Sequence, residues 1–302
     1  MKVLVTGSIK YTKEQLEKLQ EIGLEIIYIQ DERNKIELDV SEIEYVICNG
    51  LFLYNDIKEF KNLKYIQVTS AGLDRLPMEY IQENKIEVFN ARGVYSIPIA
   101  EWTVLKILEV YKKSKIFYNQ QKEHIWEKQR DIIELNGRTA CIIGYGSIGS
   151  EIAKRLKVFG VKIKVVDIQQ PESDIIDEYY SFEQIDKAII ASDIIILSLP
   201  LTEQTQNSIN KNKLEIMKQD AVLVNISRGK IINEKDLIEQ LENKKFKGVI
   251  LDVLAEEPLD KSSKLWDYDN TIITPHNCFV SDRNNERMFN VILENINKVK
   301  EG

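Results

Sequence analysis

The chain has 302 residues, of which 43% are hydrophobic, and a formal net charge of −7. This length predicts about two domains that each bury a core, and the interleaving of acidic and basic residues excludes a basic nucleic-acid-binding arm and a basic membrane helix. The three cysteines, Cys48, Cys141 and Cys278, lack the paired spacing of a zinc site or a disulfide framework.

The first residues given, Met1–Gly7, lack the long apolar stretch of a secretory leader, and no apolar run approaches the ~18 residues of a membrane-spanning helix. We therefore expect a cytoplasmic protein with no metal site, no membrane contact and no nucleic-acid partner. Two cysteines, Cys48 and Cys141, lie in apolar runs and are predicted to be small core residues.

Short apolar strands alternate with amphipathic helices along the chain, which predicts parallel sheets with helical crossovers. In the first unit, Thr12 is a candidate N-cap for a helix that Gly23 ends. This unit finishes near Pro98. Its strands are predicted at Val3–Thr6, Glu25–Ile29, Tyr45–Cys48, Tyr65–Val68 and Glu87–Phe89.

A long helix is predicted from Ile99 to about Tyr118, followed by a polar and aromatic stretch, Gln120–Arg130. A second alternating unit begins at Arg138, and Ser181 with Gln184 predicts a capping box before a helix that reaches Ile190. The strands of the second unit are predicted at Thr139–Ile143, Lys162–Val166, Ile194–Leu199, Ala221–Asn225, Val249–Leu251 and Thr271–Thr274.

The last predicted helix, Asp282–Lys300, has no strand after it in the second unit. We infer that this helix crosses back to the first unit. The expected organisation is one domain formed by residues 1–98 and 281–302, with a second domain, residues 99–280, inserted into it. The fold class is therefore α/β, with two doubly wound parallel sheets.

A glycine-rich loop, Gly144–Gly149, follows the first strand of the second unit and precedes a helix. Gly144 permits a tight turn, Gly146 lets the backbone approach a pyrophosphate, and Gly149 lets the helix pack against the sheet. The free N–H groups at the helix N-terminus then favour phosphate. This context predicts a dinucleotide site.

Asp167 ends the next strand, 18 residues after Gly149, close to the spacing of about 20 that this kind of site shows. A carboxylate at this position binds the ribose hydroxyls of NAD and repels the 2′-phosphate of NADP. Since no arginine follows it to accept a phosphate, NAD is the predicted cofactor. The position of the site in mid-chain excludes the arrangement in which a nucleotide unit opens the chain.

Three further residues suit the reduction of a keto acid. His276 follows the apolar run Ile272–Pro275, Glu257 lies upstream, and Arg228 precedes a glycine after a strand. An imidazole exchanges protons near neutral pH, a carboxylate fixes its tautomer, and a guanidinium binds a carboxylate through two hydrogen bonds. Taken singly, the histidine and the arginine also fit structural or surface roles. His124 lies in no such pattern and is interpreted as a structural or surface residue.

The chain resembles the D-isomer-specific 2-hydroxyacid dehydrogenases over nearly its whole length. The resemblance rests on the ordered segments Ser96–Glu101, Gly144–Gly149, Leu199–Thr202, Asn225–Gly229, Leu251–Val253, Glu256–Pro258 and Thr274–His276. It implies a Rossmann NAD-binding domain inserted in a flavodoxin-like substrate-binding domain. It also implies a homodimer through residues 99–130 that converts a D-2-hydroxy acid into its 2-keto acid.

The resemblance also implies which residues form the site. The catalytic set is Arg228, Glu257 and His276, with His276 as general acid and base. The substrate-binding residues are Ser70, Ala71, Gly72, Arg228 and His276, and the turn that contains Ser70–Gly72 receives the substrate carboxylate through its backbone N–H groups. The cofactor residues are Gly144, Tyr145, Gly146, Ser147, Ile148, Gly149, Asp167, Leu199, Pro200, Thr205, Ile226, Ser227, Arg228, Asp252 and His276.

Some of these roles have alternatives. Asp252 is expected near the nicotinamide carboxamide or as the cap of a loop, and Leu199, Pro200 and Thr202 line the cofactor or pack a loop. Arg75 and Arg92 either meet a second anion, such as a phosphate, or lie on a solvated face. The resemblance favours phosphoglycerate-, hydroxypyruvate- or glyoxylate-type substrates, and since the core is followed by no further segment we expect no control through an appended domain.

Two other functions compete with this interpretation. An NADH-sensing regulatory protein on the same fold has no need of a proton donor, so the complete arginine, glutamate and histidine set disfavours it. A reductase of the alanine dehydrogenase type is disfavoured by the order of the segments around Arg228 and His276.

Overall fold

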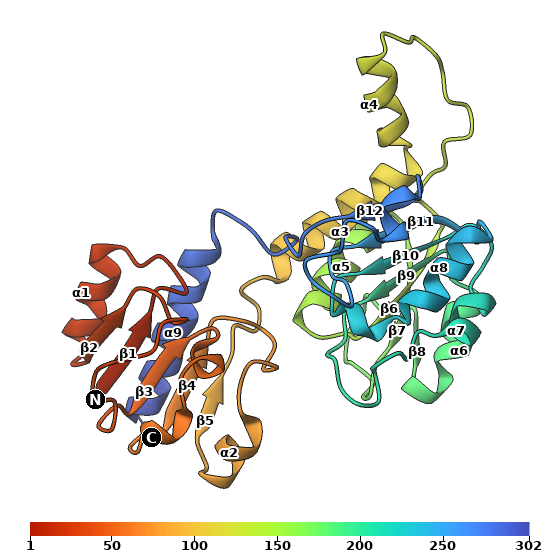
Figure 1. The fold of residues 1–302 in the computed structure, drawn as a ribbon. Coiled ribbons are helices and arrows are strands. Elements are labelled where there is room, and N and C mark those ends of the chain that lie inside the picture. Colours follow the sequence, from red (N-terminus) through yellow and green to blue (C-terminus); the bar gives the residue numbers. More distant parts are fainter. Residues whose placement is uncertain (302) are drawn as a thin grey trace. The chain divides into compact units, whose positions relative to one another are not determined.

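The computed structural model describes residues 1–301, and these divide into two compact units. Unit 1 comprises residues 1–95 and the segment that begins at Ser281, and unit 2 comprises Ser96–Val280. Each unit is built around one parallel sheet, which confirms the predicted α/β fold class with two doubly wound sheets (Figure 1).

The sheet of unit 1 has five parallel strands in the order β2-β1-β3-β4-β5. Four of its strands have the predicted bounds, and β1 begins one residue earlier than predicted. The strands are β1 (Lys2–Thr6), β2 (Glu25–Ile29), β3 (Tyr45–Cys48), β4 (Tyr65–Val68) and β5 (Glu87–Phe89).

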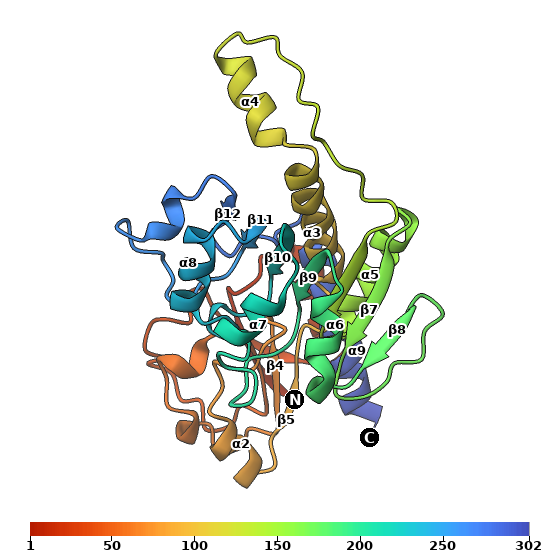
Figure 2. The same ribbon diagram turned by 90° about the vertical axis from the view of Figure 1, so that its right-hand side faces the viewer.

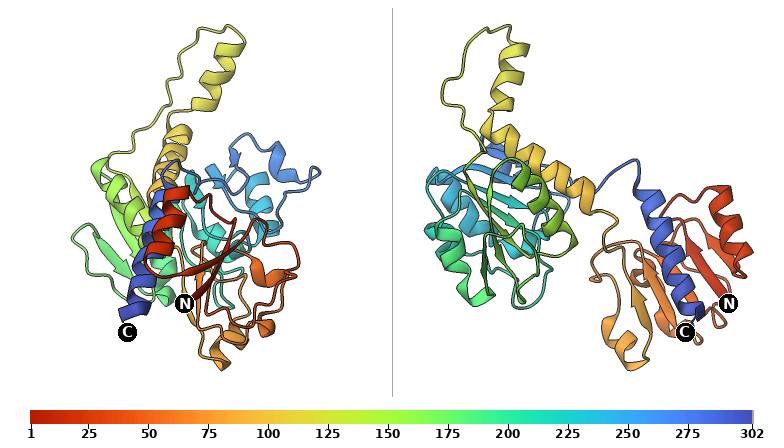
Figure 3. Two further views of the ribbon diagram at one scale, coloured as in Figure 1. Left: turned by 90° about the vertical axis from the view of Figure 1, so that its left-hand side faces the viewer. Right: turned by 180° about the vertical axis from the view of Figure 1, so that it is seen from behind.

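Helices cover both faces of this sheet. On one face, apolar side chains of α1 (Lys13–Glu21) and α9 (Asn284–Glu301) pack against Val3, Val5 and Ile47. On the other face, α2 (Met78–Glu83) and the loops after β3 cover Leu4, Val46 and Ile66. The predicted capping box of Thr12 at the start of α1 is confirmed. The right-hand view of Figure 3 shows α9 lying along the sheet of unit 1, although it ends the chain.

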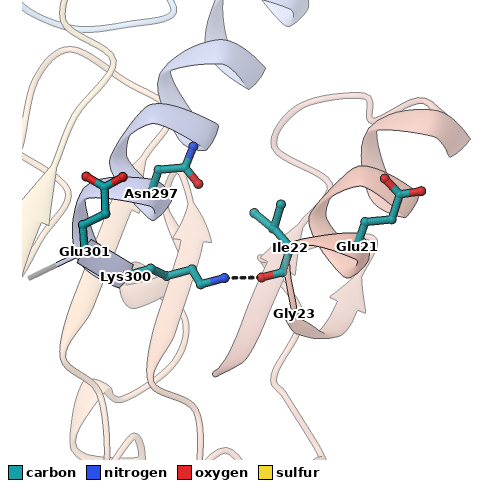
Figure 4. A pocket seen from close by; sticks show the side chains of 6 residues that line it. All are labelled: Glu21, Ile22, Gly23, Asn297, Lys300 and Glu301. Carbon is teal, nitrogen blue, oxygen red and sulfur yellow. Dashed lines mark hydrogen bonds between the residues drawn. The ribbon is translucent and has the colours of Figure 1, made fainter.

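A shallow hollow of about 480 Å³ lies between the C-terminal ends of α1 and α9 in unit 1. Figure 4 shows its lining, in which the Lys300 ammonium donates to the carbonyl oxygen of Ile22. This ammonium satisfies a carbonyl group at the end of α1.

The sheet of unit 2 has seven parallel strands in the order β12-β11-β10-β9-β6-β7-β8. The edge strand β8 was not predicted, and the predicted strand ending at Leu199 stops two residues earlier. The strands are β6 (Thr139–Ile143), β7 (Lys162–Val166), β8 (Glu178–Tyr180), β9 (Ile194–Leu197), β10 (Ala221–Asn225), β11 (Phe246–Leu251) and β12 (Thr271–Ile273).

Buried side chains of α6 (Ile185–Ile190), α7 (Lys211–Ile216) and α8 (Glu234–Glu242) pack on one face of this sheet. The predicted capping box of Ser181 and Gln184 is confirmed just before α6. Helices α3 (Ser96–Tyr111) and α5 (Ser147–Val158) lie side by side (Figure 2). Gly248 of β11 lets α3 approach closely, since a Cβ there would stand 2.7 Å from Val110 Cγ1.

The prediction of one continuous helix from Ile99 to about Tyr118 is wrong. The helix breaks at Lys113, whose left-handed φ of 54° starts a separate helix, α4 (Ser114–Lys122). Helix α4 and the chain after it project from the rest of unit 2 in every view, and α4 has no buried side chain. Among residues 1–301, no helix is long and apolar enough to cross a membrane.

Candidate active site

The predicted site residues of unit 2 follow the carboxyl ends of six strands that are consecutive in the sheet. The glycine loop follows β6, Asp167 follows β7, and Leu199 and Pro200 follow β9. Arg228, Glu257 and His276 follow β10, β11 and β12. From β6 the strand order runs through β7 and β8 toward one edge of the sheet, and from β9 it runs through β10 to β12 toward the other edge. Open parallel sheets bind ligands at such a change in strand order, here between β6 and β9.

The glycine loop has the geometry of a phosphate-binding turn. Gly144 has a φ of 94°, and a Cβ at Gly149 would stand 2.2 Å from the Gly144 carbonyl oxygen. A Cβ at Gly146 would meet no atom within 4 Å. The N-terminus of α5 also lacks a side-chain cap, so its N–H groups are free to bind phosphate. The residues present therefore fit the pyrophosphate of a dinucleotide.

The two glycines should respond differently to substitution by alanine. Gly149→Ala forces backbone displacement, because its Cβ would overlap the Gly144 carbonyl, and we expect it to lower thermal stability. Gly146→Ala meets open space, so the fold should keep its stability while NADH affinity falls at least about tenfold. Thermal unfolding and NADH fluorescence titration of both variants test this pair. Unchanged NADH affinity in Gly146→Ala would contradict the assignment.

Asp167 is fixed beside the glycine loop. Its Oδ2 accepts the N–H of Tyr145 at 2.6 Å and its Oδ1 accepts the N–H of Ile168 at 2.7 Å. The Tyr145 hydroxyl lies 3.2 Å from the Ser173 hydroxyl, which ties the glycine loop to the segment after Asp167. This arrangement holds a negative charge in one place next to the candidate phosphate site.

His276 and Glu257 form a hydrogen-bonded pair. His276 Nδ1 lies 2.9 Å from Glu257 Oε2, and the two side chains are 40% and 38% exposed. The other carboxylate oxygen, Oε1, accepts the N–H of Leu254 at 3.0 Å. Within the described part of the chain, His276 Nε2 bonds no protein group, so this nitrogen is available to a ligand.

The backbone around His276 is held by Asp252, which is only 1% exposed. The Asp252 carboxylate accepts the Thr274 hydroxyl and the N–H groups of Asn277 and Cys278, and its carbonyl accepts the N–H of His276 at 2.8 Å. His276 itself has a left-handed φ of 49°, a conformation that is uncommon outside glycine. These are the bonds of a loop cap, while the predicted contact of Asp252 with the cofactor stays a prediction.

Arg228 lies in extended backbone three residues after β10, and its Nη1 donates to the Ser227 carbonyl at 2.7 Å. Asn225 shapes this turn, because its amide donates to the Arg228 carbonyl and accepts the N–H and hydroxyl of Ser227. A Cβ at Gly229 would stand 1.8 Å from the Leu254 carbonyl carbon. The loops that carry Arg228 and Glu257 are therefore in direct backbone contact.

Sequence reasoning missed the structural roles of Asn225 and Gly229. Asn225 had a usable signal, a polar residue ending an apolar strand, whereas no local pattern identifies the backbone on which Gly229 packs.

The other predicted cofactor residues lie in the same loops. Ile226 and Ser227 are buried, as is Leu199, and Pro200 is exposed. The Thr205 hydroxyl donates to the Pro200 carbonyl at 2.7 Å and accepts the N–H of Thr202 at 2.7 Å. Thr205 therefore closes the loop after β9.

In unit 1, the predicted substrate turn Ser70–Gly72 follows β4. The Ser70 hydroxyl donates to the Gly72 carbonyl at 2.8 Å, and the Asn90 amide donates to the Ala71 carbonyl at 2.9 Å. The N–H groups of Ala71 and Gly72 donate to no protein group within the described residues, so they are free to bind a carboxylate. Arg75 and Arg92 are both exposed.

The three cysteines supply no reactive thiolate to this site. All three thiols are buried, as predicted for Cys48 and Cys141. Burial raises the pKa of Cys141 to about 12 and also raises the pKa of Cys48 and Cys278. The reactive thiolate form is therefore absent near neutral pH. No group of three or more His, Cys, Asp or Glu side chains that could hold a metal is found in residues 1–301.

Comparison with known protein families gives one match that covers more than half of the chain. The model described as "D-isomer specific 2-hydroxyacid dehydrogenase, NAD binding domain" matches residues 104–278. This match spans the glycine loop, Asp167, Arg228, Glu257 and His276.

Individual relatives are similar over most of the chain. A hydroxypyruvate reductase of Thermotoga maritima is 36% identical over 82% of this chain and 80% of its own length. A D-3-phosphoglycerate dehydrogenase of Methanocaldococcus jannaschii is 31% identical over 100% of this chain, which spans only 58% of that longer relative. The solved structure of a D-lactate dehydrogenase from Aquifex aeolicus, complexed with NAD and lactic acid, is 25% identical with a TM-score of 0.80, over 99% of this chain and 96% of that one.

Proposed function

The chain belongs to the D-isomer specific 2-hydroxyacid dehydrogenase family, and from this membership we propose that it interconverts a D-2-hydroxy acid and its 2-keto acid. Membership makes it an oxidoreductase that acts on a CH–OH group with NAD or NADP. We propose that unit 2 is the NAD-binding domain, expected at residues 99–280, and that unit 1 is the substrate-binding domain, expected at residues 1–98 and 281–302.

The observation that carries the proposal is the pairing of His276 with Glu257. Nδ1 lies 2.9 Å from a Glu257 oxygen, and since an ionised carboxylate can only accept, we assign a proton to Nδ1. The proton that moves during the reaction is then the one on Nε2. A nicotinamide cofactor held by the glycine loop and Asp167 would supply the hydride for reduction at C2 of the keto acid. His276 Nε2 donates its proton to the keto oxygen, and Glu257 stabilises the imidazolium before that transfer. In the reverse direction His276 Nε2 takes the hydroxyl proton.

The substrate carboxylate needs cationic or N–H donors. Arg228 supplies a planar guanidinium that binds a carboxylate through two parallel hydrogen bonds. The free N–H groups of Ala71 and Gly72 support the same role for the turn Ser70–Gly72, since successive unbonded N–H groups in a turn are a common anion site. We propose that both elements bind the carboxylate and that His276 binds the neighbouring oxygen.

For the cofactor we propose NAD rather than NADP, held by the glycine loop, Asp167 and the loops after β9, β10 and β11. The support is the Asp167 carboxylate, whose two oxygens are fixed by backbone N–H groups. A fixed negative charge repels a 2′-phosphate and accepts hydrogen bonds from ribose hydroxyls.

Asp167→Asn tests this preference, because it removes the charge and keeps the size of the side chain. We expect the ratio of kcat/KM for NADH over NADPH to fall by roughly tenfold or more, since the Coulomb repulsion is lost. Asp174→Asn removes an exposed charge from the following loop and should leave the ratio unchanged. Wild-type enzyme that prefers NADPH would refute the proposal.

Among substrates we propose hydroxypyruvate, glyoxylate or phosphoglycerate types, supported by similarity to relatives that bear such names. The chain spans only 58% and 53% of the length of two phosphoglycerate dehydrogenase relatives. We therefore do not assign the complete activity of these longer proteins to this chain. Arg75 and Arg92 are exposed and form no ion pair within residues 1–301, which leaves both available to a second anion.

A panel of 2-keto acids with NADH tests the proposed activity. Hydroxypyruvate, glyoxylate, pyruvate, branched keto acids and phosphohydroxypyruvate are each incubated with the protein, and NADH consumption is followed by absorbance. We expect turnover with at least one small keto acid of the hydroxypyruvate or glyoxylate type. Tight NADH binding without turnover of any keto acid would contradict the proposal and favour an NADH-sensing regulator.

We further propose a homodimer through residues 99–130. The support is the projecting helix α4 and the segment after it, which expose large apolar side chains: Ile116, Phe117, Tyr118, Ile125 and Trp126, the last of them 101% exposed. Such exposed patches on a projecting element are typical of interfaces. Light scattering should give twice the mass of one chain, and a monomer would contradict the proposal. The cytoplasmic location stays a prediction from the sequence.

A further inference from the structure

His276 is held by Glu257 at only one point of its ring. The single hydrogen bond to Nδ1 restrains one edge of the ring, but small coupled changes of χ1 and χ2 can keep that bond and still tilt the plane of the imidazole. The side chain is 40% exposed, so packing against the protein covers only part of the ring. An acid that must present Nε2 to a substrate oxygen needs a second contact that fixes the plane of its ring.

The structure contains such a contact. The rings of His276 and Phe279 are 6.1 Å apart between centroids and perpendicular, with an angle of 88° between their planes. Perpendicular aromatic pairs within about 4.5–7 Å attract each other beyond simple burial. Phe279 is 36% exposed, so its ring does not belong to the buried core.

The backbone around Phe279 is itself anchored. The preceding residue, Cys278, is buried and donates its N–H to the Asp252 carboxylate at 3.0 Å. The following residue, Val280, donates its N–H to the Asn277 carbonyl at 3.1 Å and so closes a turn around Phe279. Asp252 therefore supports both rings, since its carbonyl also accepts the N–H of His276.

We propose that Phe279 is a positioning residue for His276, one that fixes the plane of the imidazole while Glu257 fixes its tautomer. This inference rests on the proposed role of His276 as general acid and base. Phe279 contributes through the shape of its ring. A side chain that is apolar but not flat leaves the imidazole free to turn, and the fraction of enzyme with Nε2 correctly directed falls.

Two substitutions separate the flat ring from its apolar character. Phe279→Leu keeps an apolar side chain of similar size, whereas Phe279→Tyr keeps the ring. We expect Leu to lower kcat roughly three- to tenfold with an unchanged Kd for NADH, and Tyr to stay within about twofold of the wild type. Val280→Ala, at the neighbouring exposed residue, is the matched control and should keep full activity.

A spectroscopic measurement reads the ring contact without any turnover. The chain has two histidines, His124 and His276, so its imidazole NMR signals are few and His124→Gln assigns them. An aromatic neighbour displaces the signals of a nearby ring. In Phe279→Leu we expect the His276 signals to move and those of His124 to stay in place.

The outcomes distinguish this inference from the proposed function. A Phe279→Leu enzyme with wild-type kcat, or with unmoved His276 signals, overturns the positioning role. If His276→Gln retains wild-type turnover, then the proposed function has failed, whatever the result at Phe279. Loss of activity in both Phe279→Leu and Phe279→Tyr also overturns the role, because an aromatic ring at position 279 would then not be enough to position His276.

Discussion

Replacing His276 by glutamine is expected to lower kcat about a thousandfold, within the range of roughly 10² to 10⁴ for loss of a general acid. Glutamine can still form hydrogen bonds, but it has no proton that it can give up near neutral pH. The Kd for NADH should change less than about threefold, because the glycine loop and Asp167 are untouched. Stopped-flow kinetics and NADH fluorescence titration measure the two quantities.

The chain supplies its own control for this substitution. His124 is the second of its two histidines, and His124→Gln should retain wild-type kcat. A His276→Gln enzyme within about tenfold of the wild-type kcat would be inconsistent with general acid catalysis by this residue. Equal losses in both variants would point to a general effect on folding instead.

Replacing Arg228 by lysine should lower kcat/KM for the keto acid about a hundredfold. Lysine keeps the positive charge but loses the planar pair of donors that binds a carboxylate through two hydrogen bonds. Each charge-assisted hydrogen bond is worth about 1.5–3 kcal/mol, so the loss of one accounts for the expected effect. Initial rates over a range of keto acid concentrations give kcat/KM for the variant and the wild type.

Lys230 provides the comparison for Arg228. It is an exposed cation two residues further along the chain, and Lys230→Gln should leave kcat/KM nearly unchanged. If Arg228→Lys were as active as the wild type, a simple positive charge would suffice and the two-bond geometry would be unnecessary. A large loss in Lys230→Gln would show that general electrostatic attraction dominates substrate binding.

The strands of both sheets follow closely from the sequence. Apolar runs such as Tyr45–Cys48 and Ala221–Asn225 are bounded by polar or turn residues and match the strands observed. The edge strand β8 escaped prediction because Glu178–Tyr180 contains no aliphatic residue. The helix break at Lys113 escaped it too, since lysine carries no signal for a left-handed backbone.

The candidate site was predictable to different degrees. The glycine loop and Asp167 carry their own local signals, because a strand, a turn and a helix surround them. The pairing of Glu257 with His276 joins residues 19 positions apart, and no local pattern indicates it. The chemistry of the side chains suggested the pair, the resemblance to a known family supported it, and the structure supplied its distance.

Other features depend on tertiary packing alone. Gly229 was visible only as part of a segment, yet its missing side chain allows contact with the backbone of Leu254. Asp252 was expected at the cofactor or as a loop cap. Only its burial and its four donors, the Thr274 hydroxyl and the N–H groups of His276, Asn277 and Cys278, show how it holds the loop of His276. Phe279 was not singled out at all, because one aromatic residue in a short loop has no periodic neighbours.

The central claim is that this chain reduces a 2-keto acid at C2. The most direct test incubates the wild-type protein with hydroxypyruvate or glyoxylate and NADH deuterated at the carbon that donates hydride, followed by mass spectrometry of the product. We predict a 2-hydroxy acid that carries deuterium at C2, with the D configuration where C2 is a stereocentre. Binding of the deuterated NADH without any labelled hydroxy acid, across the full panel of keto acids, would contradict the account.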